Sequence, residues 1–331
     1  MPVFELGYRH WEGERTSPWL RWTAISRTGI SLAFRSKILR RLVFIAWAPL
    51  LYFGPFFFGV GYVTDSKLTI RERAEWTPML RGVLGKDMAQ RVQNDPESLR
   101  PLIWSVAFHR FIAVPQGLIM ILLVAIAGAP LIAQDVGSKA FLVYFSKPIT
   151  KWEYLLGKAG TVMFFILLVT LFPALVLYAV SIAVSPSMRA VGDTWTTVPR
   201  LFASAAAVSI PATALILFLS SLAREARYVA FGWIAIWALG ETSYLILRTL
   251  PALQGSTWIL LVSPWECVNA VTGAIFDVPS QIKELGINLR RGPRSLLLSS
   301  SPAGPAAAWL AAVSLVCFAG LARRVSAPMR I

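Results

Sequence analysis

Long apolar blocks divide this chain, and they constrain its fold more than any other feature. Each block is about 20 residues long, which is the length at which an α-helix crosses roughly 30 Å of hydrocarbon. Hydrophobic residues make up 56% of the 331 residues and charged residues only 15%, too little charge for the surface of a soluble protein. The sequence therefore predicts an all-α polytopic membrane protein that contacts the lipid bilayer. Six transmembrane helices are expected, over residues 42–63, 111–134, 159–184, 201–222, 228–247 and 306–321.

Lysine and arginine residues cluster beside the ends of these blocks and predict the orientation. The four clusters are Arg35, Lys37, Arg40 and Arg41; Lys139, Lys147, Lys151 and Lys158; Arg224 and Arg227; and Arg323 and Arg324. Because cytoplasmic loops carry an excess of basic residues, all four clusters fall in the cytoplasm if both termini are cytoplasmic. We therefore expect a multi-pass protein of the cell (inner) membrane, with external loops at 64–110 and 248–305.

The net charge of +15 would suit a nucleic-acid partner, but the basic residues lie between apolar blocks and not on a polar soluble domain. We therefore expect no nucleic-acid binding. Cys267 and Cys317 cannot build a disulfide framework or a CxxC metal site. His10 and His109 fall on opposite predicted sides of the membrane, so we expect no shared histidine metal site, and no cofactor.

The chain divides into an N-terminal segment, residues 1–41, and a transmembrane domain, residues 42–331. Within the first, residues 19–39 mix leucine, isoleucine and phenylalanine with arginine and lysine. This mixture is typical of an amphipathic elbow helix that lies in the plane of the lipid headgroups. An ordinary surface helix or a flexible basic tail is the alternative, and the immediate continuation into a span favours the elbow.

Residues 258–276 are apolar enough to suggest a seventh crossing. Pro264, Glu266 and Asn269 interrupt them, and polar groups are costly inside hydrocarbon. We expect external re-entrant or surface helices here.

Glu241 is the one acidic residue well within a predicted span. An unpaired charge at this depth is costly unless it faces a cavity, finds a partner or takes up a proton. Glu241 is therefore a candidate intramembrane polar site. The equal alternative places it near the outer interface, hydrogen-bonded to Thr242, to Ser243 or to a neighbouring helix.

The sequence contains no G-x-x-x-x-G-K-[ST] motif, the loop that holds ATP phosphates in P-loop proteins. The fragment Gly82 to Asp87 is two positions too short and ends in an acid where a hydroxyl is needed. We therefore expect no catalytic residues and no ATPase activity in this chain, so that any ATP is hydrolysed by a partner.

The connection between the second and third spans carries the sharpest motif. Asp135 closes the second span, Pro148-Ile149-Thr150-Lys151 forms a turn, and Tyr154-x-x-Gly157-Lys158 opens the third span. Asp135 is placed to cap a short helix that Pro148 stops, while lysines hold the segment at the cytoplasmic face. The segment 135–158 is therefore predicted to be a rigid lever between two spans.

This motif resembles the cytoplasmic signature of ABC-2 type transporter permeases, and the order of elements is similar over nearly the whole chain. The resemblance implies a type V exporter-like transmembrane domain. It also implies partners: a second permease copy or a homologous permease, and two copies of a P-loop ABC ATPase subunit. By the same resemblance, residues 136–145 are the coupling helix that docks into a groove of the ATPase. The implied coupling residues are Asp135, Val136, Gly137, Lys139, Phe141, Leu142, Tyr144, Phe145, Lys147 and Pro148.

The function expected on this basis is that of a permease subunit, which forms the transmembrane pathway and couples ATP hydrolysis by a separate subunit to export. The apolar run Phe141 to Phe145 needs a protein or headgroup surface to cover it, and a plain interfacial connector is the alternative for this segment. For the whole chain, the alternatives are a secondary ion-coupled transporter that uses Glu241, or a membrane scaffold without transport. The absence of an internal repeat and the single intramembrane acid disfavour the secondary transporter. Nothing in the sequence selects an exported substrate.

Overall fold

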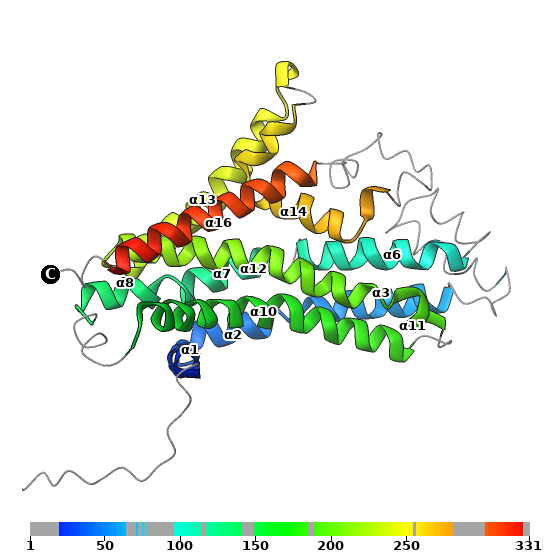
Figure 1. Ribbon diagram of the computed structural model, residues 1–331. Helices are drawn as coiled ribbons and strands as arrows, with labels where there is room; N and C mark the ends of the chain where they lie inside the picture. Colours follow the sequence, from blue (N-terminus) through cyan, green and yellow to red (C-terminus); the bar gives the residue numbers. More distant parts are fainter. Residues whose placement is uncertain are drawn as a thin grey trace, which may run out of the picture.

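The computed structural model describes residues 20–63, 71, 75, 78, 96–113, 117–140, 149–184, 189–253, 256–280 and 302–326. All regular elements within these ranges are helical. The long helices form an elongated bundle, and α1 (Arg21–Phe34) is seen nearly end-on beside it, across the direction of the other helices (Figure 1). The predicted elbow segment is therefore a helix that turns into the bundle at its C-terminal end.

Within the described residues, six helical segments are long and apolar enough to cross a membrane, and each overlaps one of the predicted spans. The six-span, all-α fold class is confirmed. The segments are Lys37–Val60, Gly117–Gly137, Lys151–Ala183, Thr197–Leu222, Ala226–Leu247 and Ala303–Val325. They are built by α2 (Lys37–Ile45) with α3 (Pro49–Val63), α7 (Gly117–Ala127) with α8 (Pro130–Gly137), α10 (Lys151–Val184), α12 (Thr197–Leu222), α13 (Ala226–Leu247) and α16 (Ala303–Ser326).

Several shorter helices lie away from the end of the bundle that carries α8 (Figure 1). They are α6 (Pro96–Phe111), α11 (Arg189–Thr194), the 3₁₀ helices η3 (Pro251–Leu253) and η4 (Thr257–Val262), and α14 (Pro264–Ile275). The 12 residues of α14 extend only about 18 Å, too short to cross the hydrocarbon. Most of α6 falls inside the predicted loop 64–110, because its charged residues gave no apolar block in the sequence. The helix lies roughly in line with α7 (Figure 1).

Helix α10 packs against α1, α3, α7 and α12. An aromatic cluster joins the C-terminal half of α10 to α3 and α6. The ring of Phe57 lies 4.7 Å from that of Phe108 and 5.3 Å from that of Trp104, which in turn lies 5.8 Å from Tyr178. Such edge-to-face and tilted ring pairs add to the stabilisation from burial, and they hold α6 against the spans.

Large apolar side chains cover much of the outer surface. Phe44, Leu51, Phe231 and Leu315 are each largely exposed on helices of the spans. So many exposed large apolar side chains are unfavourable in water and are expected where lipid chains form the solvent. The burial pattern therefore agrees with a membrane-spanning chain.

Candidate functional site

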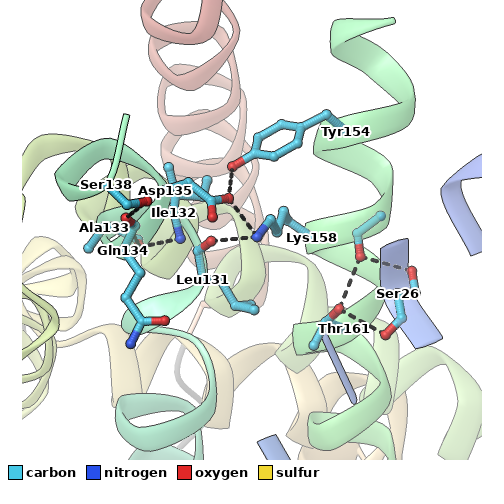
Figure 2. A network of polar contacts seen from close by, with 12 residues as sticks. Ser26, Leu131, Ile132, Ala133, Gln134, Asp135, Ser138, Tyr154, Lys158 and Thr161 are labelled. Atoms are coloured by element: carbon cyan, nitrogen blue, oxygen red, sulfur yellow. Dashed lines mark hydrogen bonds and ion pairs between the residues drawn. The ribbon is translucent and has the colours of Figure 1, made fainter. Parts of the chain in front are cut away.

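Asp135 lies in the last turn of α8 and links that helix to α10. Its Oδ2 atom lies 2.7 Å from Lys158 Nζ and accepts a 2.7 Å hydrogen bond from Tyr154 Oη (Figure 2). The prediction that Asp135 caps a following short helix is wrong, because α8 continues through this residue to Gly137. A cation and a phenol from the neighbouring helix occupy the carboxylate in place of backbone N–H groups.

Tyr154 and Lys158 reach the same carboxylate because they lie four residues apart, on one face of α10. Lys158 Nζ also donates a 2.7 Å hydrogen bond to the carbonyl oxygen of Leu131, one turn before Asp135 in α8. The Lys158 and Asp135 side chains are only 11% and 13% exposed. Removing one member of such a pair leaves a buried charge without compensation, so this contact resists separation of α8 from α10.

Gly157, between those two residues in sequence, contacts the elbow helix instead. A Cβ atom at Gly157 would lie 2.6 Å from Ile25 Cβ, and one at Gly160 would lie 2.5 Å from Ser26 Oγ. Ser26 Oγ donates a 2.8 Å hydrogen bond to the Gly157 carbonyl oxygen, and Thr161 Oγ1 lies 3.3 Å from the Ser26 carbonyl oxygen. Only glycine lets the two helix backbones approach this closely. The Tyr154-x-x-Gly157-Lys158 motif therefore holds both span two and the elbow helix within about one turn of α10.

The capping box at Thr150 and Glu153 sets where α10 begins. The Thr150 N–H donates to Glu153 Oε2 over 2.6 Å, and the Glu153 N–H is 3.3 Å from Thr150 Oγ1. These reciprocal bonds satisfy two backbone donors at the start of the helix. The last two residues of the predicted Pro-Ile-Thr-Lys turn, Thr150 and Lys151, therefore mark the start of the third span.

Ser220 of α12 bridges the break between α7 and α8. Its Oγ donates a 2.7 Å bond to the Ala129 carbonyl oxygen and accepts bonds of 3.0 and 2.9 Å from the N–H groups of Ile132 and Ala133. Pro130 starts α8 and has no N–H of its own, and the hydroxyl satisfies backbone groups at this break, where lipid offers no hydrogen bond. The sequence analysis did not single out Ser220. The signal that could have found it is Pro130, which leaves backbone groups unpaired within one span, together with serines near the end of another span that could bond them.

Members of the basic clusters that the structure describes lie at this same end of the bundle. A Cβ atom at Gly137 would lie 2.8 Å from the Arg224 carbonyl oxygen, and Arg324 Nε donates a 2.8 Å bond to the Ser221 carbonyl oxygen. The turn between α12 and α13 and the end of α16 lie at the same end of the bundle as α8 (Figure 1). We call the contacts described above around Asp135, Lys158 and Ser220 the α8–α10 junction.

A family model described as "ABC-2 family transporter protein" matches residues 35–323. The chain belongs to the ABC-2 family. The match covers the first five spans, all but the last two residues of the sixth, and the contacts of Asp135 with Tyr154 and Lys158. It makes the chain a transmembrane component of an ABC transporter, a kind of subunit that is not itself an ATPase. A comparison with curated proteins gives no match.

The predicted coupling residues of this ABC-2 protein divide into two groups. Asp135, Val136 and Gly137 belong to α8, and Lys139 follows in a turn with φ of 55°, in the left-handed region. The others lie within 141–148, outside the described residues. They are Phe141, Leu142, Tyr144, Phe145, Lys147 and Pro148.

Glu241 of the ABC-2 protein lies in the second half of α13, away from the α8–α10 junction (Figure 1). Its Oε2 accepts a 2.9 Å hydrogen bond from Ser263 Oγ, and the same hydroxyl caps α14 by accepting from the Glu266 N–H over 3.2 Å. A neighbouring segment thus supplies a hydrogen-bond partner. Burial, followed by the nearby Glu241 charge, raises the pKa of Glu266 to about 7.

Proposed function

We propose that this ABC-2 protein is the permease subunit of an exporter driven by a separate ATPase. Two copies, or one copy and a homologous permease, form the transmembrane pathway, and two P-loop ATPase subunits bind at the end of the bundle that carries the α8–α10 junction. That end faces the cytoplasm in this proposal, together with both termini. The coupling contacts extend from Asp135 to Pro148.

The observation that carries the proposal is the joint attachment of α10 to α8 and α1. Asp135 holds Tyr154 and Lys158 on one face, and Ser26 holds the Gly157 carbonyl on another. A displacement of the segment between α8 and α10 therefore acts on span two, span three and the elbow helix together. Packed interfaces of this kind move between discrete arrangements and transmit small shifts over long distances.

A cavity beside the junction gives the elbow helix room to move. It has a volume of about 540 Å³ and is lined by α1, the start of α2, α7, α8 and Lys158 of α10. Leu32 and Ile126 belong to its apolar wall, whereas Gln134, Asp135 and Lys158 make one part polar. Because α1 packs mainly on α10 among the described helices, movement of α10 against α8 carries α1 across this space. ATP binding by the partner would in this way shift the balance between inward- and outward-facing states.

The test is to copurify the ATPase with the tagged full-length chain and to measure its turnover in reconstituted vesicles. Substituting charge at the predicted docking face, with Phe141→Glu and Tyr144→Glu together, is expected to abolish copurification or to uncouple ATP turnover while the permease still inserts. The matched control is Val191→Glu with Trp195→Glu, two exposed apolar residues at the opposite end of the bundle. The control is expected to retain the ATPase. Normal binding and normal turnover with the first pair of changes would overturn the coupling assignment.

A further inference from the structure

A surface pocket on α2 combines positive charge with apolar surface. It has a volume of about 470 Å³ and is lined by Lys37, Arg40, Arg41, Phe44 and Ile45. These residues recur at the spacing that places side chains on one face of a helix. Phe44 is 82% exposed and Ile45 51% exposed, so nothing else in the described chain covers this face. We call it the basic pocket.

The three cations of the basic pocket have no acidic partner among the residues that the structure describes. Asp135, the acid of the α8–α10 junction, is already occupied by Lys158 and Tyr154. Three like charges within little more than one helical turn repel one another. The pocket therefore favours an anionic ligand that neutralises them.

The depth of the residues tells which kind of anion fits. Phe44 lies about 10 Å farther along α2 than Lys37, and α2 continues into the span Lys37–Val60. The cations consequently lie where the span begins, at the level of lipid headgroups, and the two apolar side chains lie one turn deeper. A soluble anion would use only the cations and would leave Phe44 and Ile45 uncovered.

We propose that the basic pocket binds an anionic phospholipid, with its phosphate on Lys37, Arg40 and Arg41 and an acyl chain along Phe44 and Ile45. The opposite face of α2 is anchored in the bundle through Leu39, which is fully buried. The lipid therefore holds the corner between α1 and α2, where Ser36 caps α2 in an extended conformation, at the membrane surface. This inference requires only that the chain spans the membrane, and it is independent of the ATPase coupling proposed above.

Native mass spectrometry of the purified full-length protein, with phosphatidylglycerol or phosphatidylcholine of identical acyl chains added, tests the proposal. The variant K37A/R40A/R41A is expected to lower phosphatidylglycerol retention at least about tenfold and to leave phosphatidylcholine retention unchanged. The matched control R27A/R35A/R224A removes three other exposed cations and is expected to change retention less than about twofold, since charges outside the pocket act only diffusely. The charge-preserving variant K37R/R40K/R41K is expected to retain the lipid.

Three results would overturn the proposal. An equal loss in the control and the pocket variant would mean diffuse attraction and no site. Displacement of phosphatidylglycerol by an equal concentration of inorganic phosphate would mean a site for soluble anions. Loss of retention in the charge-preserving variant, at an unchanged elution volume and melting temperature, would mean that charge does not carry the binding. Reduced retention in F44S/I45S would support the acyl-chain contact, and unchanged retention would contradict it.

Discussion

Lys158 Nζ lies 2.7 Å from the Asp135 carboxylate, and this pair joins the end of α8 to the start of α10. Because both side chains are nearly buried, losing one of them is worse than losing both. The pair therefore gives the α8–α10 junction a definite energetic signature.

Single substitutions in this pair are expected to destabilise the protein more than their combination. Lys158→Met leaves the buried Asp135 carboxylate with Tyr154 alone, at a cost of about 3–5 kcal/mol. Asp135→Asn with Lys158→Met removes both charges and is expected to recover most of that loss. Thermal unfolding of the detergent-purified protein measures the difference. Additive effects of the two changes would mean that the pair is not coupled.

Gly157→Ala is expected to displace α1 from α10, because its new Cβ atom would lie 2.6 Å from Ile25 Cβ. The melting temperature falls, and disulfide cross-linking between cysteines placed on α1 and α10 slows. Gly232→Ala is the control, since no heavy atom lies within 4 Å of a Cβ atom there, and it is expected to be neutral or slightly stabilising. Partial recovery in the double variant I25G/G157A would identify the contact with Ile25 as the cause.

Ser220→Ala is expected to destabilise the junction by about 1–3 kcal/mol, because it removes one hydroxyl that serves three backbone groups at the α7–α8 break. Ser209→Ala is a control in the same helix, since the equally buried Ser209 Oγ has no hydrogen-bond partner in the described structure. Thermal unfolding compares the two. Equal effects would show that the break does not depend on Ser220.

Glu266 is expected to make stability depend on pH. Its pKa is raised from 4.5 to about 7, mainly by burial, so the folded protein binds a proton that the unfolded chain releases between these values. The stability from this group therefore falls as the pH rises from about 4.5 to about 7. His109, whose pKa burial lowers to about 4, acts in the opposite direction. The melting temperature of the wild type minus that of Glu266→Gln, measured across this range, isolates Glu266, and a flat difference would contradict the prediction.

Cysteine labelling tests the proposed orientation. Lys139→Cys is expected to react with an impermeant maleimide only after the membrane is permeabilised, whereas Val191→Cys reacts in intact cells. The native cysteines, Cys267 and Cys317, are both buried and are replaced by alanine to remove background. The reverse pattern would place the α8–α10 junction outside the cell.

The sequence by itself determined the six spans and singled out residues 135–158. Both are local properties: a helix crosses a membrane if its own stretch is long and apolar enough, and the motif occupies one short connection. The sequence did not predict helix α6, because Arg100, His109 and Arg110 interrupt its apolar pattern. The folded bundle nevertheless buries Arg100 and His109.

Only the tertiary structure decided what the motif residues contact. The sequence predicts Asp135 to be a helix cap, whereas its partners in the structure are Tyr154 and Lys158, 19 and 23 residues farther along the chain on α10. Ser26 meets Gly157 across 131 residues, and Ser220 meets Ala129 across 91. Such contacts depend on which helices become neighbours and at what rotation. That choice is made by the packing of whole helices, because no single segment of sequence encodes both sides of a contact.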